Sequence, residues 1–142
     1  MRRLLTTILT ILVVSAPSVD VLAAATAPKA ALKKIIAKKT FTGASFQADE
    51  WGQLQITMVV TKTTTITGAK KTVKRHIDSI KVPVKPDHTS RSVFISQNSL
   101  PTLIQEALKA QSTHIYVVSG ATYTSDAFAR SLQSAITKEK VW

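Results

Sequence analysis

One stretch of the sequence, residues 53–84, calls for a long antiparallel β-hairpin. Every second residue of its first part is apolar: Leu54, Ile56, Met58 and Val60. This alternation is typical of a strand with one buried face, and the β-branched threonines of Thr61–Thr67 continue the β preference. Gly68–Lys71 is a turn candidate, and a second β segment then runs to Val84. Its alternation fails between Arg75 and Ser79, which predicts a bulge or break there.

The remaining sequence adds helices to this hairpin. A short strand is expected over Phe41–Phe46, a loop over Lys85–Ser92 and a further short β segment or helix approach over Val93–Ile95. Asn98–Pro101 resembles a helix start, since Asn and Ser cap helices and proline is tolerated in the first turn. The predicted apolar face of this helix is Leu100, Leu103, Ile104, Ala107 and Leu108.

A second helix is expected from about Ser125, and a buried strand is expected just before it. Ile115–Val118 is a continuous apolar run, which suits a strand buried on both faces. The apolar face of the final helix is Phe128, Leu132, Ala135 and Ile136. The order of elements predicts an α+β domain: an antiparallel sheet with a long basic hairpin and two helices packed against it.

The N-terminal region has the features of an export signal. Arg2 and Arg3 precede the apolar segment Leu4–Ala16, and small residues follow at Ala23–Ala25. We therefore expect a signal peptide over residues 1–25 and an exported protein, extracellular or in the cell envelope. An uncleaved membrane anchor is the alternative, although the apolar segment is shorter than the ~20 residues of a span.

Lysines dominate the next segment, residues 26–40. They alternate with aliphatic residues at helical spacing. A solvated tether is the favoured interpretation, and a cationic amphipathic stretch resting on an anionic membrane is the other. The globular domain is then expected over residues 41–142.

Charge and composition narrow the function classes. The formal net charge is +11, and the eight aromatic residues are scattered, so no aromatic-plus-basic groove for nucleic acid is expected. Such a charge also suits anionic lipid, an acidic wall polymer or a phosphate-bearing cofactor. The chain has no cysteine and three isolated histidines, which argues against disulfides and a metal site. The sequence has neither the paired carboxylates of a glycosidase nor the nucleophile elbow of an α/β-hydrolase, so nothing in it indicates a hydrolase.

The segment Ser119–Ser125 is the candidate site. A small-residue turn with Gly120 precedes a helix start, and four hydroxyls lie within the seven residues: Ser119, Thr122, Thr124 and Ser125. A helix N-terminus exposes unpaired N–H groups and favours an anion such as phosphate. An ordinary capped helix start explains the same residues, so physical reasoning alone leaves both interpretations open.

The segment Ser119-Gly120-Ala121-Thr122-Tyr123-Thr124-Ser125 resembles the signature of the FMN-binding domain family. That family includes the flavin-carrying subunits of the sodium-pumping quinone reductase and of the related Rnf complex, and small exported single-domain proteins. The similarity covers roughly residues 41–137. Its other parts are Trp51–Gln55, Ser90-Arg91, Leu100-Pro101, Glu106–Leu108, Ala110–Ser112 and Ser131–Ala135.

The resemblance implies an electron-transfer flavoprotein without substrate chemistry of its own. FMN would be held by Ser119, Gly120, Ala121, Thr122, Tyr123, Thr124 and Ser125. Thr122 matches the threonine to which a flavin transferase attaches FMN through its phosphate. Arg91 is a candidate partner of the phosphate or the reduced ring, with a loop salt bridge or plain solvation as its other role. A redox partner in the cell envelope would exchange electrons with the flavin.

Two departures from the family keep alternatives open. Family members in which FMN is attached covalently usually carry an aspartate three residues before the motif serine, as part of the pattern that the transferase recognises. This chain has Tyr116 there. Covalent and non-covalent FMN therefore both remain. The basic hairpin Thr61–Arg75 is longer than in small members. The alternative function is accordingly a cationic envelope-binding module that kept the fold and lost the flavin. Trp51 is expected either to stack on the flavin ring or to fill the core edge, and Lys109 to face solvent.

Overall fold

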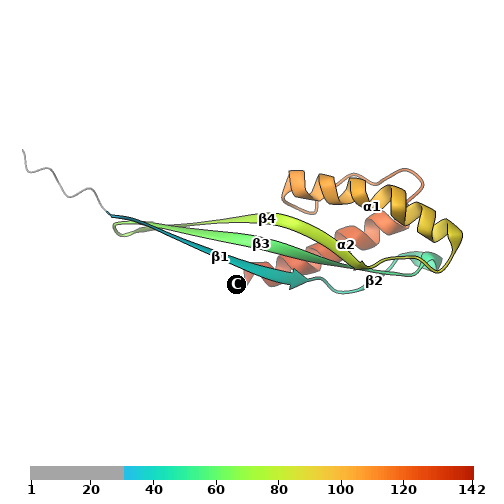
Figure 1. Cartoon of the computed structure of the whole chain (residues 1–142), viewed down its shortest axis with the longest axis horizontal. Coiled ribbons are helices and arrows are strands. Elements are labelled where there is room, and N and C mark those ends of the chain that lie inside the picture. Colours follow the sequence, from blue (N-terminus) through green and yellow to red (C-terminus); the bar gives the residue numbers. More distant parts are fainter. Residues whose placement is uncertain (1–30) are drawn as a thin grey trace, which may run out of the picture.

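Residues 31–142 are described by the computed structural model, and they form a four-stranded antiparallel sheet with two helices (Figure 1). The predicted α+β fold is confirmed. Residues 1–25, assigned to the signal peptide, and residues 26–30 of the predicted spacer lie outside the described residues. The elements are β1 (Leu32–Thr42), β2 (Phe46–Gln47), the 3-10 helix η1 (Asp49–Trp51), β3 (Gln53–Thr67), β4 (Lys70–Val84), α1 (Ser90–Ala110) and α2 (Thr122–Lys140).

The predicted hairpin is confirmed as β3 and β4. Their register runs from Gln55 opposite Val84 to Thr67 opposite Lys70, which leaves a two-residue turn. Gly68 has a φ of 59° in this turn, and such a value costs glycine nothing. The register shifts where Val59 faces Ser79 and the next residue of β3 faces Ile77. One extra residue of β4 lies there, so the bulge predicted between Arg75 and Ser79 is also confirmed.

The lysine-rich segment is a strand from Leu32 onward, so its prediction as a tether or helical stretch was wrong for these residues. β1 pairs with β3 from Leu32 opposite Thr67 to Thr42 opposite Thr57. Because β4 pairs with the same part of β3, the two strands must flank β3 on its two sides. The free edge of β3 offers a row of N–H and C=O groups to an extended neighbour. An isolated helix this short would be marginal in water.

The core lies between the sheet and the two helices. All four alternating apolar residues of β3 are buried, and so are the central residues of both predicted helix faces, which confirms those patterns. Ile104, Leu108 and Ile136 pack at the margin of this cluster. The largest fully buried apolar side chains are Phe128, Leu54, Ile56, Met58, Leu103, Leu132 and Val60.

The first helix begins at Ser90, about eight residues before the predicted start. Thr89 and Ser92 form a capping box, in which Thr89 Oγ1 accepts from Ser92 N at 3.0 Å and Ser92 Oγ accepts from Thr89 N at 3.0 Å. This cap turns the expected loop end and the Val93–Ile95 β segment into helix. Pro101 lies inside α1. The expected capping side chains bond back to the preceding turn instead, with Asn98 Nδ2 donating to the Phe94 carbonyl at 2.7 Å.

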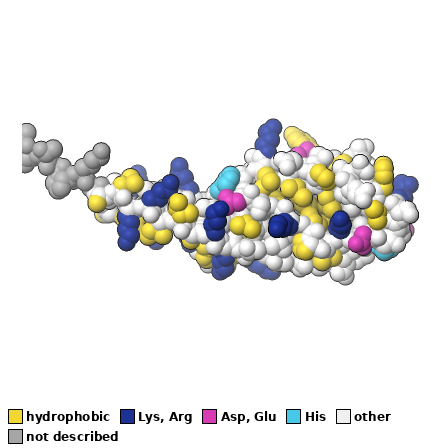
Figure 2. Space-filling view, viewed as in Figure 1, with side chains coloured by type: hydrophobic (Ala, Val, Ile, Leu, Met, Phe, Trp, Pro, Cys, Tyr) yellow, Lys and Arg dark blue, Asp and Glu magenta, His cyan; other side chains and the backbone are white. Residues whose placement is uncertain are grey.

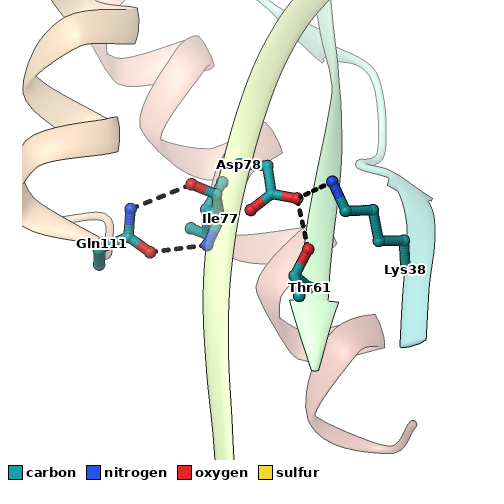
Figure 3. Close-up of polar contacts among 5 residues, drawn as sticks. All are labelled: Lys38, Thr61, Ile77, Asp78 and Gln111. Carbon is teal, nitrogen blue, oxygen red and sulfur yellow. Dashed lines mark hydrogen bonds and ion pairs between the residues drawn. The ribbon is translucent and has the colours of Figure 1, made fainter. Parts of the chain in front are cut away.

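Side chains fix the bulge in β4 from both sides (Figure 3). Gln111 Oε1 accepts from Ile77 N at 2.7 Å, and Gln111 Nε2 donates to Ile77 O at 3.1 Å. The bulge residue Asp78 accepts from Thr61 Oγ1 at 2.5 Å and lies 3.2 Å from Lys38 Nζ. The Thr61 hydrogen bond, with Lys38 beside it, holds the pKa of Asp78 below its ordinary value of 3.8.

The C-terminal end of the described chain is docked on the sheet. The ring of Trp142 lies 5.5 Å from that of Phe41, centre to centre. Lys62 Nζ lies 4.7 Å from the Trp142 ring centre and also donates to the main-chain oxygen of that residue. Nearby, Arg75 Nε pairs with the carboxylate of Glu139 at 2.6 Å. These contacts hold the C-terminal end of α2 against the middle of the strands.

Candidate functional site

The run Ile115–Val118, predicted to be a buried strand, is irregular and partly exposed. Tyr116 is 83% exposed and Val117 is 59% exposed. Two main-chain N–H groups of the run donate to side chains and not to a neighbouring strand. Tyr116 N donates to Glu106 Oε2 at 3.0 Å, and Val118 N donates to Ser125 Oγ at 3.1 Å. The run thus packs as a loop between α1 and α2, and the motif follows it directly.

The motif begins with a tight turn at Gly120. Ala121 N donates to the carbonyl of Val118 at 2.9 Å, and Gly120 has a φ of 78°. A Cβ added to Gly120 would meet no other atom within 4 Å. The positive φ therefore explains the glycine, and the open space leaves its backbone accessible to a ligand.

The second helix begins at Thr122, three residues earlier than predicted, and its N-terminus is uncapped. Ala121 occupies the N-cap position and has no side chain that can accept a hydrogen bond. Ser125 N reaches the Ala121 carbonyl at 2.9 Å, so the N–H groups of residues 122–124 have no partner within the helix. Together with the helix dipole, they form a place for an anion.

The four hydroxyls of the motif divide into two pairs. Thr124 and Ser125 are buried, with 1% and 2% exposure, whereas Ser119 and Thr122 are exposed. Ser125 Oγ donates to the Ala121 carbonyl at 2.8 Å while it accepts from Val118 N. Ser125 therefore braces the turn, and the hydroxyls of Ser119 and Thr122 are the ones that a ligand in solvent can reach.

Two cavities flank the loop that carries the motif. One, of about 260 Å³, lies between α1 and the turn and is lined by Arg91, Phe94, Ile95, Asn98, Ser99 and residues 118–121. The other, of about 390 Å³, lies beside the start of α2 and is lined by Ile115, Tyr116, Val117, Thr122, Tyr123, Ser125, Asp126, Ala129 and Arg130. Their volumes are of the order of small-molecule sites.

The structure brings Arg91 to the motif, although it places that residue differently from the prediction. Arg91 lies in the first turn of α1 instead of in a loop. Its guanidinium carbon lies 5.7 Å from the centre of the Trp51 ring, so Trp51 faces this cation. The same Arg91 lines the cavity that contains Ser119, Gly120 and Ala121. Lys109 is exposed, as predicted.

Exposed aromatic residues surround the two cavities. Phe94 is 67% exposed and Tyr123 is 55% exposed, and with Tyr116 they give each cavity at least one aromatic wall. Aromatic side chains left in solvent commonly mark a binding surface. Sequence reasoning missed Phe94, and the capping box at Thr89 was the signal that could have placed it on a helix near the motif.

Within residues 31–142, no three His, Asp or Glu side chains come together as ligands for a metal ion. Over the same residues, none of the helices has the length and apolar character needed to cross a membrane.

The model of the FMN-binding domain matches residues 50–137, which include Arg91, the motif and most of both helices. No curated protein matched the chain.

Proposed function

The chain belongs to the FMN-binding domain family, its cofactor is FMN, and on that premise we propose that it is an exported electron carrier with its flavin phosphate at Ser119–Ser125. The basic hairpin lies at the other end of α2 from the motif (Figure 1), so an envelope-binding role for the hairpin is compatible with a flavin at the motif. The observation that carries the proposal is the exposed Thr122 at the first position of an uncapped helix.

The residues present suit the phosphate of FMN. Three main-chain N–H groups at the start of α2 need acceptors, and Gly120 leaves room for close approach. Arg91 adds a cation on the α1 side of the turn, where it favours both phosphate and the negative charge of a reduced flavin. Phe94, Tyr116 and Tyr123 supply aromatic surface for the ring system.

We further propose that the hydroxyl of Thr122 carries the flavin covalently. Thr122 Oγ1 would form a bond to the flavin-side phosphorus of an activated flavin nucleotide, and the phosphoanhydride bond of that donor would break. The other half of the donor would leave with the second phosphate, and the hydroxyl proton would pass to the transferase. Exposure of Thr122 supports this, since the transferase must reach it. A covalent bond also suits an exported protein, because a dissociable cofactor is lost by dilution.

The remaining part of the proposal concerns electron transfer outside the cytoplasm. Bound FMN supplies one- and two-electron redox chemistry, while the protein sets its binding and electrostatics. The N-terminal signal pattern supports export. The exposed cavities leave the site open to a redox partner in the envelope.

Co-production with a flavin transferase in an exporting host tests the proposal. We expect yellow protein that shows flavin absorbance and whose flavin can be reversibly reduced and reoxidised. Mass spectrometry after denaturation should show an added FMN-sized mass that Thr122→Ala removes and Ser119→Ala retains. Colourless protein would contradict the flavin site. Coloured protein that loses its flavin on denaturation would contradict only the covalent bond.

A further inference from the structure

The outer parts of the hairpin and of β1 form a projecting structure, here named the distal ribbon: residues 32–37 of β1, 62–67 of β3 and 70–75 of β4. At its base Lys62 and Arg75 contact the C-terminal end of α2. These strands extend past the helices (Figure 1). The last residue of the chain, Trp142, contacts Lys39 and Lys62 at its base. The buried apolar residues of β3 end at Val60, and beyond it Thr64 is the one buried residue of the ribbon. All residues that β1 and β4 contribute to the ribbon are exposed to solvent.

The distal ribbon is strongly cationic at its outer end. Its exposed lysines there are Lys33, Lys34, Lys70, Lys71 and Lys74. No acidic residue occurs in 31–37 or 61–75, and the ion pairs found within residues 31–142 involve none of these five lysines. Figure 2 shows the basic side chains spread along the projection, with the nearest acidic ones where it joins the rest of the molecule. This uncompensated charge calls for an anionic partner.

Aliphatic side chains lie exposed among these lysines. Leu32 is 68% exposed, Ile36 58%, Ile35 45% and Val73 37%. Since successive residues of a strand point to opposite faces, Leu32 and Ile36 lie on one face of the ribbon. Ile35 lies on the other, with Val73 in the same row. A polar polymer offers no apolar surface for these side chains to contact. The boundary between lipid head groups and acyl chains accommodates both aliphatic side chains and lysines.

We propose that the distal ribbon inserts tip-first into the surface of an anionic lipid bilayer. Tip-first insertion buries the aliphatic side chains of both faces, which a ribbon lying flat could not do. A depth of about 10 Å corresponds to roughly three residues of a strand, enough to reach from the row of Leu32 to that of Ile35. The five lysines then meet lipid phosphates.

The path of the chain supports the same orientation. Leu32 lies in the row of Thr67 and Lys70, next to the Gly68-Ala69 turn. The chain that precedes Leu32 therefore joins the fold at the outer tip of the ribbon. The 19 residues of α2 span about 28 Å between the ribbon base and Thr122. Docking by the tip thus leaves the proposed flavin site on the aqueous side.

Vesicle binding tests this inference. The full chain is mixed with phosphatidylcholine vesicles that contain or lack phosphatidylglycerol, and the bound fraction is measured by flotation. We expect a preference for the anionic vesicles that falls more than tenfold when Lys33, Lys34, Lys70 and Lys71 are changed to Gln. The matched control changes Lys81, Lys85, Lys109 and Lys140 to Gln, all of them exposed and outside the ribbon, and should retain the preference. Every variant has the same N-terminus, so the comparison isolates the ribbon.

A second variant separates lipid from a soluble polyanion. Leu32→Ser with Ile36→Ser should weaken binding to anionic vesicles several-fold and leave binding to dextran sulfate unchanged. Val84→Ser with Val141→Ser, exposed residues outside the ribbon, serves as its control. Equal loss in the two lysine variants would overturn the proposal. An unchanged vesicle affinity of the Leu32/Ile36 variant would overturn it in favour of a polymer partner. Flavin content has no bearing on either outcome.

Discussion

Gly43 and Ser131 are in direct contact, and no side chain could separate them. A Cβ built on Gly43 would lie 2.1 Å from the carbonyl oxygen of Ser131. Ser131 Oγ in turn accepts from Ile56 N at 3.0 Å and donates to the Ala44 carbonyl at 2.7 Å. The buried Ser131 of α2 thus supplies hydrogen bonds to the main chain of the sheet just after β1 ends. These bonds fix the position of α2, whose first residue is Thr122, relative to the sheet.

Gly43→Ala should therefore destabilise the protein by about 3 kcal/mol or more, because the new methyl group meets main-chain atoms that cannot rotate away. Chemical denaturation measures the change. Ala44→Gly, one residue further along in an exposed position, is the control and should cost less than half as much. A Gly43→Ala protein of normal stability would show that α2 can shift on the sheet.

Gly120→Ala should cost less, about 1–2 kcal/mol, since its penalty is the positive φ alone and the surrounding space is open. The same change should weaken FMN binding, because relaxation of the turn moves the main chain that faces the ligand. Denaturation and FMN fluorescence titration would be run on the same sample. Loss of stability without any loss of FMN affinity would argue that this turn does not contact the cofactor.

Arg91→Gln should lower FMN affinity roughly 10- to 100-fold, the worth of a hydrogen bond to a charged group. The cation lies on the wall of the cavity that reaches the motif. Lys109→Gln removes the same charge from an exposed position on the same helix and should leave the affinity within twofold. Equal effects of the two variants would show that Arg91 contributes only to the general field of this basic protein.

The elements that the sequence predicted well are those whose burial pattern is strict. The alternation from Leu54 to Val60 and the helical spacing around Leu103 and Phe128 each require one buried face, and the structure buries them all. Gly68 likewise marked the hairpin turn. These patterns lie within short segments of the sequence, so they can be recognised without knowing which distant residues the segment contacts.

The errors fall where distant partners decide the conformation. The lysines of β1 form a strand only because β3 offers a free edge. Ile115–Val118 forms no strand, since Glu106 and Ser125 accept from its N–H groups. The start of α1 was missed because its capping box uses Ser92 where Glu or Gln is the familiar signal. At the site, the motif located the turn, but the burial of Thr124 and Ser125 depends on packing that sequence spacing does not reveal.

Asp78 should make the stability of the folded protein depend on pH in the acidic range. Its pKa in the folded protein is lowered, chiefly by the Thr61 hydrogen bond and then by Lys38. Its stabilising contribution is therefore present above its ordinary pKa of 3.8 and is lost as the pH falls through the lower folded value. Asp78→Asn should reduce the unfolding temperature at neutral pH and have little effect near about pH 2. Asp87→Asn, in an exposed loop, is the control. A difference for Asp78→Asn that stays constant across this range would contradict the role of its charge.

Glu106 should matter for attachment of the flavin in spite of its distance from the motif in sequence. Its carboxylate accepts from the N–H of Tyr116 at 3.0 Å, so a carboxylate lies beside the main chain of the residue where modified family members are expected to carry an aspartate. Glu106→Gln keeps an acceptor of the same shape and removes the charge, and we expect it to slow modification of Thr122 by a flavin transferase about tenfold or more. Tyr116→Asp in the Glu106→Gln background should restore the rate, because a carboxylate then returns on the side chain of the residue that Glu106 contacts. Glu50→Gln, an exposed carboxylate outside both cavities, is the control. Modification of Glu106→Gln at the normal rate would show that the transferase does not read this charge.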